Sequence, residues 1–248
     1  MKTSALAFAL LTASGPAFAA DPSGSELLGK VDAALSAFKD AVFESKLVLR
    51  QPSGAAREYV FTTYQKAPDK RLVRFSAPGD VKGMGVLVEN KDTMYVFLPG
   101  FQRVRRMGTH IKNQSFMGSD FSFEDMSEIA YSHLYDAKLV GSDEKNWVLE
   151  LSAKPGLDLE FPKVKLWSDK GMYQPTRMEY SDGAGKKLKT QLRTEYYKDG
   201  PNHWQPGKVT IIDHRRNDHT SEIVFTSTKI NPGLSDDIFS VRSLVRGQ

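Results

Sequence analysis

The 248-residue chain contains no cysteine. This absence excludes disulfide bonds, thiolate zinc sites, iron–sulfur clusters and cysteine nucleophiles together. A lipid anchor of the bacterial lipoprotein kind also needs a cysteine, so we expect none on the mature protein. Any catalytic or binding centre must therefore be built from other side chains.

A strong charge of either sign is also absent. The 34 Lys and Arg residues nearly balance the 30 Asp and Glu residues, which leaves a formal net charge of +4. A charge this small, spread along the chain, gives no argument for nucleic acid as a partner. Hydrophobic residues make up 40% of the chain and charged residues 26%, a composition that excludes a disordered or collagen-like protein.

Long hydrophobic runs are missing after residue 19. Before it, Lys2, an apolar stretch from Ala5 to Thr12 and the small-residue pattern Ala17-Phe18-Ala19 are typical of a secretory signal peptide. The apolar stretch is shorter than the roughly 20 residues that span a bilayer. We therefore expect a signal peptide over residues 1–19, export to the periplasm, and a single soluble domain over residues 20–248.

One helix and a long series of strands are expected in the mature chain. Apolar residues from Leu27 to Phe38 recur at spacings of three and four, which predicts an amphipathic helix within Ser25–Val42. From Val42 the hydrophobic period falls to two, with turn residues between the runs. The predicted strands are Val42–Arg50, Glu58–Gln65, Arg71–Ser76, Gly83–Glu89, Thr93–Leu98, Gln102–Met107, Tyr135–Val140, Trp147–Ser152, Lys163–Trp167, Gln174–Tyr180, Lys187–Tyr197, Gly207–His214 and Glu222–Lys229.

This strand rhythm breaks between Thr109 and Ser132. Ser119 or Ser122 is placed to cap a short helix through Glu124–Ala130, whose first turn is acidic. Open twisted sheets of more than about ten strands curl or split. We therefore expect a mainly β protein with one strongly curled antiparallel sheet, covered by the N-terminal helix and this central helical insertion.

No catalytic or metal-binding motif is present. The segment Asp213–His219 holds two histidines and two acids, which fits a metal or acid–base site less well than a solvated hairpin tip. Asp120, Glu124 and Asp125 are similar to the carboxylate pair of a glycosidase, but capping and turn roles suit their surroundings better. We expect no enzyme activity, no cofactor and no metal, with an exported hydrolase as the least favoured alternative.

Arg103, Arg105 and Arg106 form the densest basic stretch. In an extended strand, Arg103 and Arg105 point to one face and Arg106 points to the other. Two interpretations stay open: a solvated strand edge, or a contact for anionic lipid headgroups or an acidic partner.

Large apolar side chains gather in the segment that lacks periodicity. They can plug the core, or they can form a mobile cover that contacts a hydrophobic cargo, for which methionine is adaptable. The candidate cargo contacts are Phe116, Met117, Phe121, Phe123 and Met126 in this segment, with Phe61, Phe75, Leu87 and Phe97 in the expected sheet.

Four segments carry a family resemblance. They are Lys66–Phe75, the glycine-rich run that ends in Leu87–Asn90, Met94–Pro99, and Phe116–Asp125. Together they resemble the LolA/LolB superfamily of periplasmic lipoprotein carriers, and the last is similar to a LolA-like branch of outer-membrane lipoprotein-sorting proteins. The resemblance covers essentially the whole mature chain. It implies an incomplete antiparallel β-barrel whose hydrophobic cavity, lidded by helices, holds acyl chains.

The resemblance has one departure. LolA-type carriers tend to have an arginine just before the proline that begins a strand of the sheet, and that arginine is tied to lid closure. Here Ala67 precedes Pro68, and Lys66 and Arg71 are the candidates to replace the arginine. Proteins similar to this branch are also associated with RND/MMPL-type exporters, which implies an inner-membrane transporter as a partner.

The expected function is that of a monomeric periplasmic carrier. It would bind acyl chains of lipoproteins or lipids in a hydrophobic cavity and shuttle them between membranes, in outer-membrane lipoprotein sorting or lipid export. At about 0.8 kcal/mol for each buried CH₂, an acyl chain needs little polar recognition. The alternative is a non-enzymatic envelope adaptor that docks to a transporter without carrying cargo.

Overall fold

The computed structural model describes residues 21–247 except 51–53, 68, 91–92, 109–113, 124, 126–129 and 202. The expected signal peptide lies outside the described residues. The elements are α1 (Gly24–Leu35), β1 (Asp40–Arg50), β2 (Ala56–Lys66), β3 (Lys70–Ala77), β4 (Gly85–Asn90), β5 (Thr93–Leu98), η1 (Pro99–Phe101), β6 (Arg103–Met107), η3 (Tyr131–His133), β7 (Tyr135–Ser142), β8 (Asn146–Ala153), β9 (Lys163–Asp169), β10 (Pro175–Ser181), β11 (Lys187–Thr194), β12 (Tyr197–Lys198), β13 (Trp204–Gln205), β14 (Lys208–Asp213), η4 (His214–Arg216), β15 (His219–Ile230), η5 (Asp236–Ile238) and α2 (Val241–Arg246).

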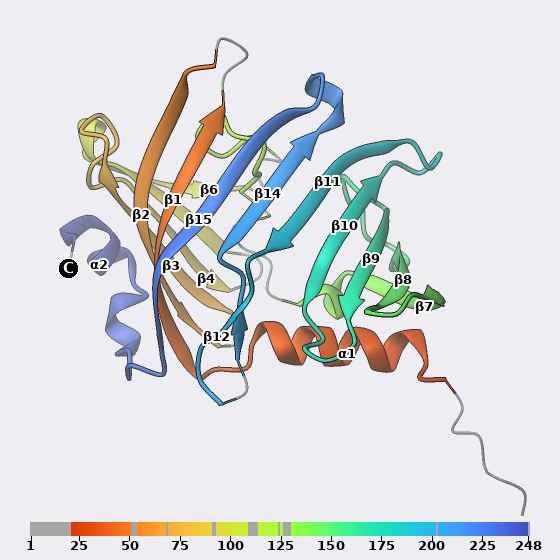
Figure 1. Ribbon diagram of the computed structural model, residues 1–248. Helices are drawn as coiled ribbons and strands as arrows, with labels where there is room; N and C mark the ends of the chain where they lie inside the picture. The colour runs from red at the N-terminus through yellow and green to blue at the C-terminus, as the bar shows by residue number, and fades with distance from the viewer. Residues whose placement is uncertain are drawn as a thin grey trace, which may run out of the picture.

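One antiparallel sheet of 13 strands forms the body of the molecule, in the order β6-β5-β4-β3-β2-β1-β15-β14-β11-β10-β9-β8-β7. The first strand, β1, pairs with the last, β15, so the chain returns to the middle of the sheet. β6 and β7 are the two edges, and the sheet curls without closing (Figure 1). Bulges in β1, β2 and β10 support this curl, because a bulge bends its strand. The predicted fold class is confirmed.

Helix α1 packs on β7 and β8 (Figure 1). Its buried residues Leu27, Leu28 and Val31 join inward side chains of β7 to β10 in one hydrophobic cluster. The helix ends at Leu35 and not near Val42, because β1 already begins at Asp40. No helix in the described part of the chain is long and apolar enough to cross a membrane.

The C-terminal segment covers the outer face of β3, β4 and β5 (Figure 1). Phe239 and Leu244 pack there against Leu87 and Phe97. α2 comes so close that a Cβ added to Gly85 would lie 2.5 Å from Cδ1 of Leu244. The sequence pattern does not predict this helix, and part of the sheet is therefore buried on both faces where one buried face was expected.

Candidate functional site

Part of the chain between the edge strands β6 and β7 packs on the inner face of β1 to β5 through Phe116, Phe121 and Phe123. We call its described residues 114–123 and 125 the cover. Ser115 and Ser122 pair there as an isolated antiparallel bridge. Met117 and Gly118 turn the chain between them with φ angles of 57° and 76°.

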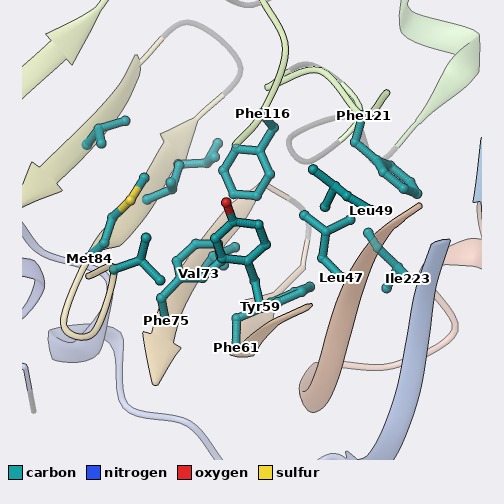
Figure 2. Packing of buried hydrophobic residues seen from close by; sticks show 14 of the residues in the cluster. Leu47, Leu49, Tyr59, Phe61, Val73, Phe75, Met84, Phe116, Phe121 and Ile223 are labelled. Carbon is teal, nitrogen blue, oxygen red and sulfur yellow. The ribbon is translucent and has the colours of Figure 1, made fainter. Parts of the chain in front are cut away.

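Aromatic side chains of the cover fill the space beneath it (Figure 2). Phe116 is fully buried, and its ring centre lies 5.6 Å from that of Phe75 and 5.2 Å from that of Phe123. Phe121 is also buried and lies near Ile223 in the same cluster. In this arrangement the protein's own side chains therefore occupy the interior below the cover.

Asp120 fastens the cover to the opposite end of the chain. Its carboxylate is fully buried and accepts hydrogen bonds from Arg216 Nη1 at 2.8 Å, His219 Nδ1 at 2.7 Å and Ser221 Oγ at 2.7 Å. The Asp120 N–H donates in turn to Ser221 Oγ at 3.1 Å. A buried carboxylate is stable only when it is paired and hydrogen-bonded, so Asp120 holds the cover on β15 and η4.

Asp125 makes the second attachment. Lys189 Nζ of β11, whose side chain is 2% exposed, donates to both Asp125 oxygens at 2.8 and 3.0 Å. The Asp125 N–H donates to Ser122 Oγ at 3.1 Å, and Asp125 Oδ2 accepts from the Ser122 N–H at 2.7 Å. This reciprocal pair is a capping box, which agrees with Ser122 as a predicted cap, although 124 and 126–129 of the predicted helix lie outside the described residues.

A cavity of about 170 Å³ lies in the curl beside the cover. Its apolar lining residues are Leu35, Phe38, Phe43, Phe61, Phe121, Pro206, Val209, Ile223 and Phe225. Its polar lining residues, which we call the polar wall, are Thr63, Gln65, Arg71, Asp125, Tyr131, Gln174, Gln191, Arg193, His203 and Gln205. An engineered cavity of about 150 Å³ holds one benzene molecule. The cavity is therefore smaller than a whole acyl chain needs.

Two arginines belong to the polar wall. Arg71 Nη2 donates to Gln65 Oε1 at 3.0 Å, and Arg193 Nε donates to Gln191 Oε1 at 3.1 Å. His203 also lies there, and its burial lowers the pKa of the imidazole below the usual value near 6.5. The ring is accordingly neutral at pH 7.

The predicted cargo residues divide between two faces of the sheet. Phe61, Phe75, Phe116 and Phe121 belong to one inner cluster, against which Met117 and Phe123 pack. Only Phe61 and Phe121 of these line the cavity. Met126 lies outside the described residues.

Leu87 and Phe97 lie on the other face of the sheet from Phe61 and Phe75. Both side chains lie on the outer face under the C-terminal segment, whereas their neighbours Val86, Val88 and Val96 face inward. Side chains alternate between the faces of a strand, and here both faces are apolar, so the sequence pattern did not distinguish them.

Three predicted arginines lie on the edge strand β6. Arg103, Arg105 and Arg106 are exposed, and none forms an ion pair with a residue in the described ranges. Phe101 at the adjoining turn is 74% exposed. Both interpretations of this stretch stay open.

The two proposed substitutes for a latch arginine lie apart. Lys66 Nζ bonds to Asp236 at 3.2 Å and to the Leu234 carbonyl at 3.0 Å, both in the C-terminal segment. Only Arg71 lines the cavity. The position of Pro68 lies outside the described residues, so the comparison rests on its neighbours.

The histidines near Asp213 form no shared centre. His214 Nε2 lies 2.8 Å from Thr190 Oγ1 and its Nδ1 contacts Asp218, which is the order of a catalytic triad. However, Thr190 is 2% exposed and belongs neither to the lining of the cavity beside the cover nor to that of the hollow around Asp120 and Lys189. Among the described residues, no group of three or more His, Asp and Glu side chains is arranged to hold a metal.

The polar wall was not predicted, although alternate positions of two strands carry a pattern that indicates it. Lys189, Gln191 and Arg193 occupy alternate positions of β11 and so share its inner face. Thr63 and Gln65 continue the inner face of β2 beyond Phe61 in the same way. Polar residues at the inward positions of a buried strand indicate a functional lining.

Comparisons with known proteins agree on the fold. A domain described as an outer membrane lipoprotein-sorting protein from Vibrio parahaemolyticus has a TM-score of 0.81 at 24% identity, covering 90% of this chain and 98% of that one. A DUF1329 family protein from Desulfovibrio piger has a TM-score of 0.81 at 26% identity, covering 89% and 97%. A LolA superfamily protein from Nitrosomonas europaea has a TM-score of 0.74 at 18% identity, covering 90% and 99%.

The amino-acid sequence matches the model of one protein family. No curated protein matches the chain. The model of a family described as "Uncharacterized protein" matches residues 67–246, which is more than two thirds of the chain. The chain therefore belongs to that family, and its fold is that of the LolA/LolB superfamily.

Proposed function

We propose that the protein is a periplasmic carrier that binds acyl chains of lipoproteins or lipids and shuttles them between membranes. The observation that carries the proposal is the cover: an aromatic plug, held on an apolar hollow by the side-chain contacts of Asp120 and Asp125, next to a cavity. A plug fixed in this way can leave the hollow without breaking any pairing of the 13-stranded sheet.

Loading requires the plug to move, because about 170 Å³ is less than an acyl chain occupies. Exposing Phe116, Phe121 and Phe123 costs about 2 kcal/mol for each ring. An acyl chain of ordinary length contributes about 10 kcal/mol on burial at about 0.8 kcal/mol for each CH₂. Burial of the cargo therefore offsets the exposure of the three rings.

The proposal includes the location and the unit of function. Residues 1–19 act as a cleaved signal peptide, and residues 20–248 act as one monomeric carrier domain. The solved structure from Vibrio parahaemolyticus that shares the fold is described as a lipoprotein-sorting domain, which supports acyl-bearing cargo and a non-enzymatic role.

Identification of the cargo is the direct test. The protein is purified from the envelope of its own host, and the organic molecules that accompany it are extracted and identified by mass spectrometry. Acyl lipids or lipoproteins in near-stoichiometric amount are expected. Recovery of the protein without any acyl compound, together with failure of the delipidated protein to bind a fluorescent fatty acid, contradicts the proposal.

A cavity-filling variant tests the place of binding. Val209 lines the cavity and Val140 is an exposed residue of β7. Val209→Trp should reduce binding of the fluorescent fatty acid at least tenfold, whereas Val140→Trp should leave it unchanged. Thermal unfolding of both variants checks that they fold, and equal binding by both places the cargo elsewhere.

The second candidate function is an envelope adaptor that docks to an RND/MMPL-type transporter without cargo. The exposed residues Arg103, Arg105 and Arg106 on the open edge β6, beside the exposed Phe101, favour it. A stable complex with an inner-membrane transporter in native mass spectrometry, without lipid and lost in the triple Arg→Gln variant, supports the adaptor over the carrier.

A further inference from the structure

The lining of the cavity contains more polar side chains than the binding of an acyl chain requires. A hydrocarbon is held by apolar contact alone, yet about half of the residues that line the cavity are polar or charged. These side chains come from separate parts of the chain: β2, β3, β11, the β9–β10 turn and the β12–β13 hairpin. Their convergence on one small space indicates a site for a polar group.

The charge of this wall is positive. Arg193 keeps its proton at any physiological pH, and no carboxylate lies within ion-pair distance of it among the described residues. It donates hydrogen bonds to two neutral groups, Gln191 Oε1 at 3.1 Å and Tyr131 Oη at 3.4 Å. The one acid in the lining, Asp125, is already neutralised by Lys189.

Two buried polar atoms of the wall lack a partner. Gln174 is 2% exposed and His203 is 3% exposed, and neither Gln174 Oε1 nor His203 Nδ1 has a hydrogen-bond partner among the described residues. Each unsatisfied buried group costs about 1–3 kcal/mol. His203 Nδ1, when it carries the ring proton, can donate to an anionic oxygen, and Gln174 Oε1 can accept from a hydroxyl of the bound head.

The glutamines add donors to the same space. Gln65 and Gln191 use their carbonyl oxygens to accept from Arg71 and Arg193, which directs arginine donors along the wall and leaves each amide NH₂ as a further donor. A guanidinium group can donate two parallel hydrogen bonds to a pair of oxygens of a carboxylate or a phosphate.

We infer that the polar wall binds the anionic head, a carboxylate or phosphate, of an acyl amphiphile whose chain lies against Phe43, Phe61 and Phe225. The inference rests on the proposed carrier function and narrows its cargo to amphiphiles that enter with the head inside the curl. An uncharged amphiphile with the same chain would leave the positive charge of Arg193 without an anionic partner.

Displacement of the neutral fluorescent probe 1-N-phenylnaphthylamine from the delipidated mature protein at pH 7.5 tests this inference. The competitors are hexadecanoic acid, hexadecan-1-ol and a 16-carbon lysophosphatidic acid. At least one anion should displace the probe at about tenfold lower concentration than the alcohol. The acid and the lysophosphatidate together show whether a carboxylate or a phosphate is preferred.

Variants of Arg193 assign the preference to the wall. Arg193→Gln should remove the preference for the anion while the alcohol binds as before, and Arg193→Lys should retain part of it. Arg177→Gln, on an exposed arginine of β10 that pairs with Glu179, is the matched control and should change nothing. Thermal unfolding of each variant confirms that it is folded.

The outcomes separate the two proposals. Equal displacement by acid, lysophosphatidate and alcohol overturns the anionic-head site but leaves the carrier function standing. A preference that Arg193→Gln and Arg193→Lys both retain in full also overturns the site. If none of the three amphiphiles displaces the probe, the carrier function itself fails.

Discussion

The buried carboxylate of Asp120 connects the cover to η4 and β15. The Asp120 carboxylate accepts hydrogen bonds from Arg216, His219 and Ser221, which belong to the last hairpin of the chain. Residues 114–123 and 125 of the cover supply no counter-charge, since the neighbouring Asp125 has the same sign and is paired with Lys189. The closed position of the cover thus depends on two long-range attachments more than on local structure.

Asp120→Asn should weaken the closed state. The amide keeps the size of the side chain but loses the charge that Arg216 needs, so we expect a loss of about 2 kcal/mol in the free energy of unfolding and faster uptake of a fluorescent fatty acid. Chemical denaturation and stopped-flow fluorescence measure these two quantities.

The control is Asp80→Asn, which removes the exposed pair of Asp80 with Arg57 and should cost less than about 1 kcal/mol. If both variants unfold and load alike, Asp120 is no latch.

His203 should make stability depend on pH between 7 and 5. Burial lowers the pKa of its imidazole below the ordinary value near 6.5, against the opposing charge of Asp199. The unfolded chain then binds a proton that the folded chain resists, so stability is lost as the pH falls through 6.5. In His203→Phe this part of the loss should disappear.

The measurement is the difference in unfolding free energy between pH 7.5 and pH 5 for both proteins. His133→Phe, at a partly exposed position on η3, is the control and should keep the wild-type dependence. An identical loss in His203→Phe and wild type shows that His203 does not titrate in this range.

At the scale of elements, the strands could be predicted and the helices only in part. Thirteen predicted runs correspond to the strands of the large sheet, because alternation is maintained wherever one face is buried and the other is wet. α2 has six residues, too few for a periodic signal. The end of α1 was misplaced because Phe38 continues the helical spacing, although it packs with Ala41 and Phe43 after the helix.

The position of the candidate site could be predicted, because the strand pattern breaks at the cover. The polar residues that line the site could not be predicted. Phe116 and Phe121 stood out because large apolar residues without periodicity need a special explanation. Gln174 and His203 gave no such signal, since polar residues in turns are ordinarily solvent-exposed. Only the pairing of β11 with β14 and the folding of the turns over the curl bring them into one wall.

Two glycines of α1 give a matched pair of predictions for this element. A Cβ on Gly24 would lie 2.5 Å from the backbone oxygen of Ala137 in β7, whereas a Cβ on Gly29 would meet nothing within 4 Å. Gly24→Ala should therefore cost about 2 kcal/mol, because the helix must move off the sheet. Gly29→Ala should stabilise by about 0.5–1 kcal/mol, because alanine favours the helix.

Thermal or chemical unfolding of both variants checks the prediction, with the wild type measured beside them. Equal stability of the two variants would mean that α1 does not contact β7 as closely as the structure has it.

The two edge strands of the sheet, β6 and β7, are consecutive in the chain, and the cover lies in the connection between them. The chain leaves at edge β6, forms the cover, and re-enters at edge β7, while the middle of the sheet is the pairing of β1 with β15. Asp120 attaches the cover to β15 and Asp125 attaches it to Lys189 of β11, so the cover can leave the inner face once these two contacts break. We therefore expect movement of the cover, rather than parting of strands, to open the hollow.

A reversible crosslink tests this at the level of the whole molecule. The Asp120 and Ser221 side chains are in contact, with Asp120 Oδ2 and Ser221 Oγ 2.7 Å apart, and the chain has no other cysteine to interfere. In Asp120→Cys/Ser221→Cys, the oxidised form should fail to load a fluorescent fatty acid, and reduction should restore loading to at least the wild-type rate. The reduced form loads well because the Asp120 latch is gone as soon as the disulfide opens.

The matched control is Ser115→Cys/Ser122→Cys, which links two partners inside the cover and adds no link between the cover and the sheet. Its oxidised form should load fatty acid as its reduced form does. Loading by the oxidised 120–221 pair at the rate of its reduced form would show that cargo enters while the cover stays on β15. The hollow would then have to open along the edges β6 and β7, and Asp120 would be a structural contact without a part in transport.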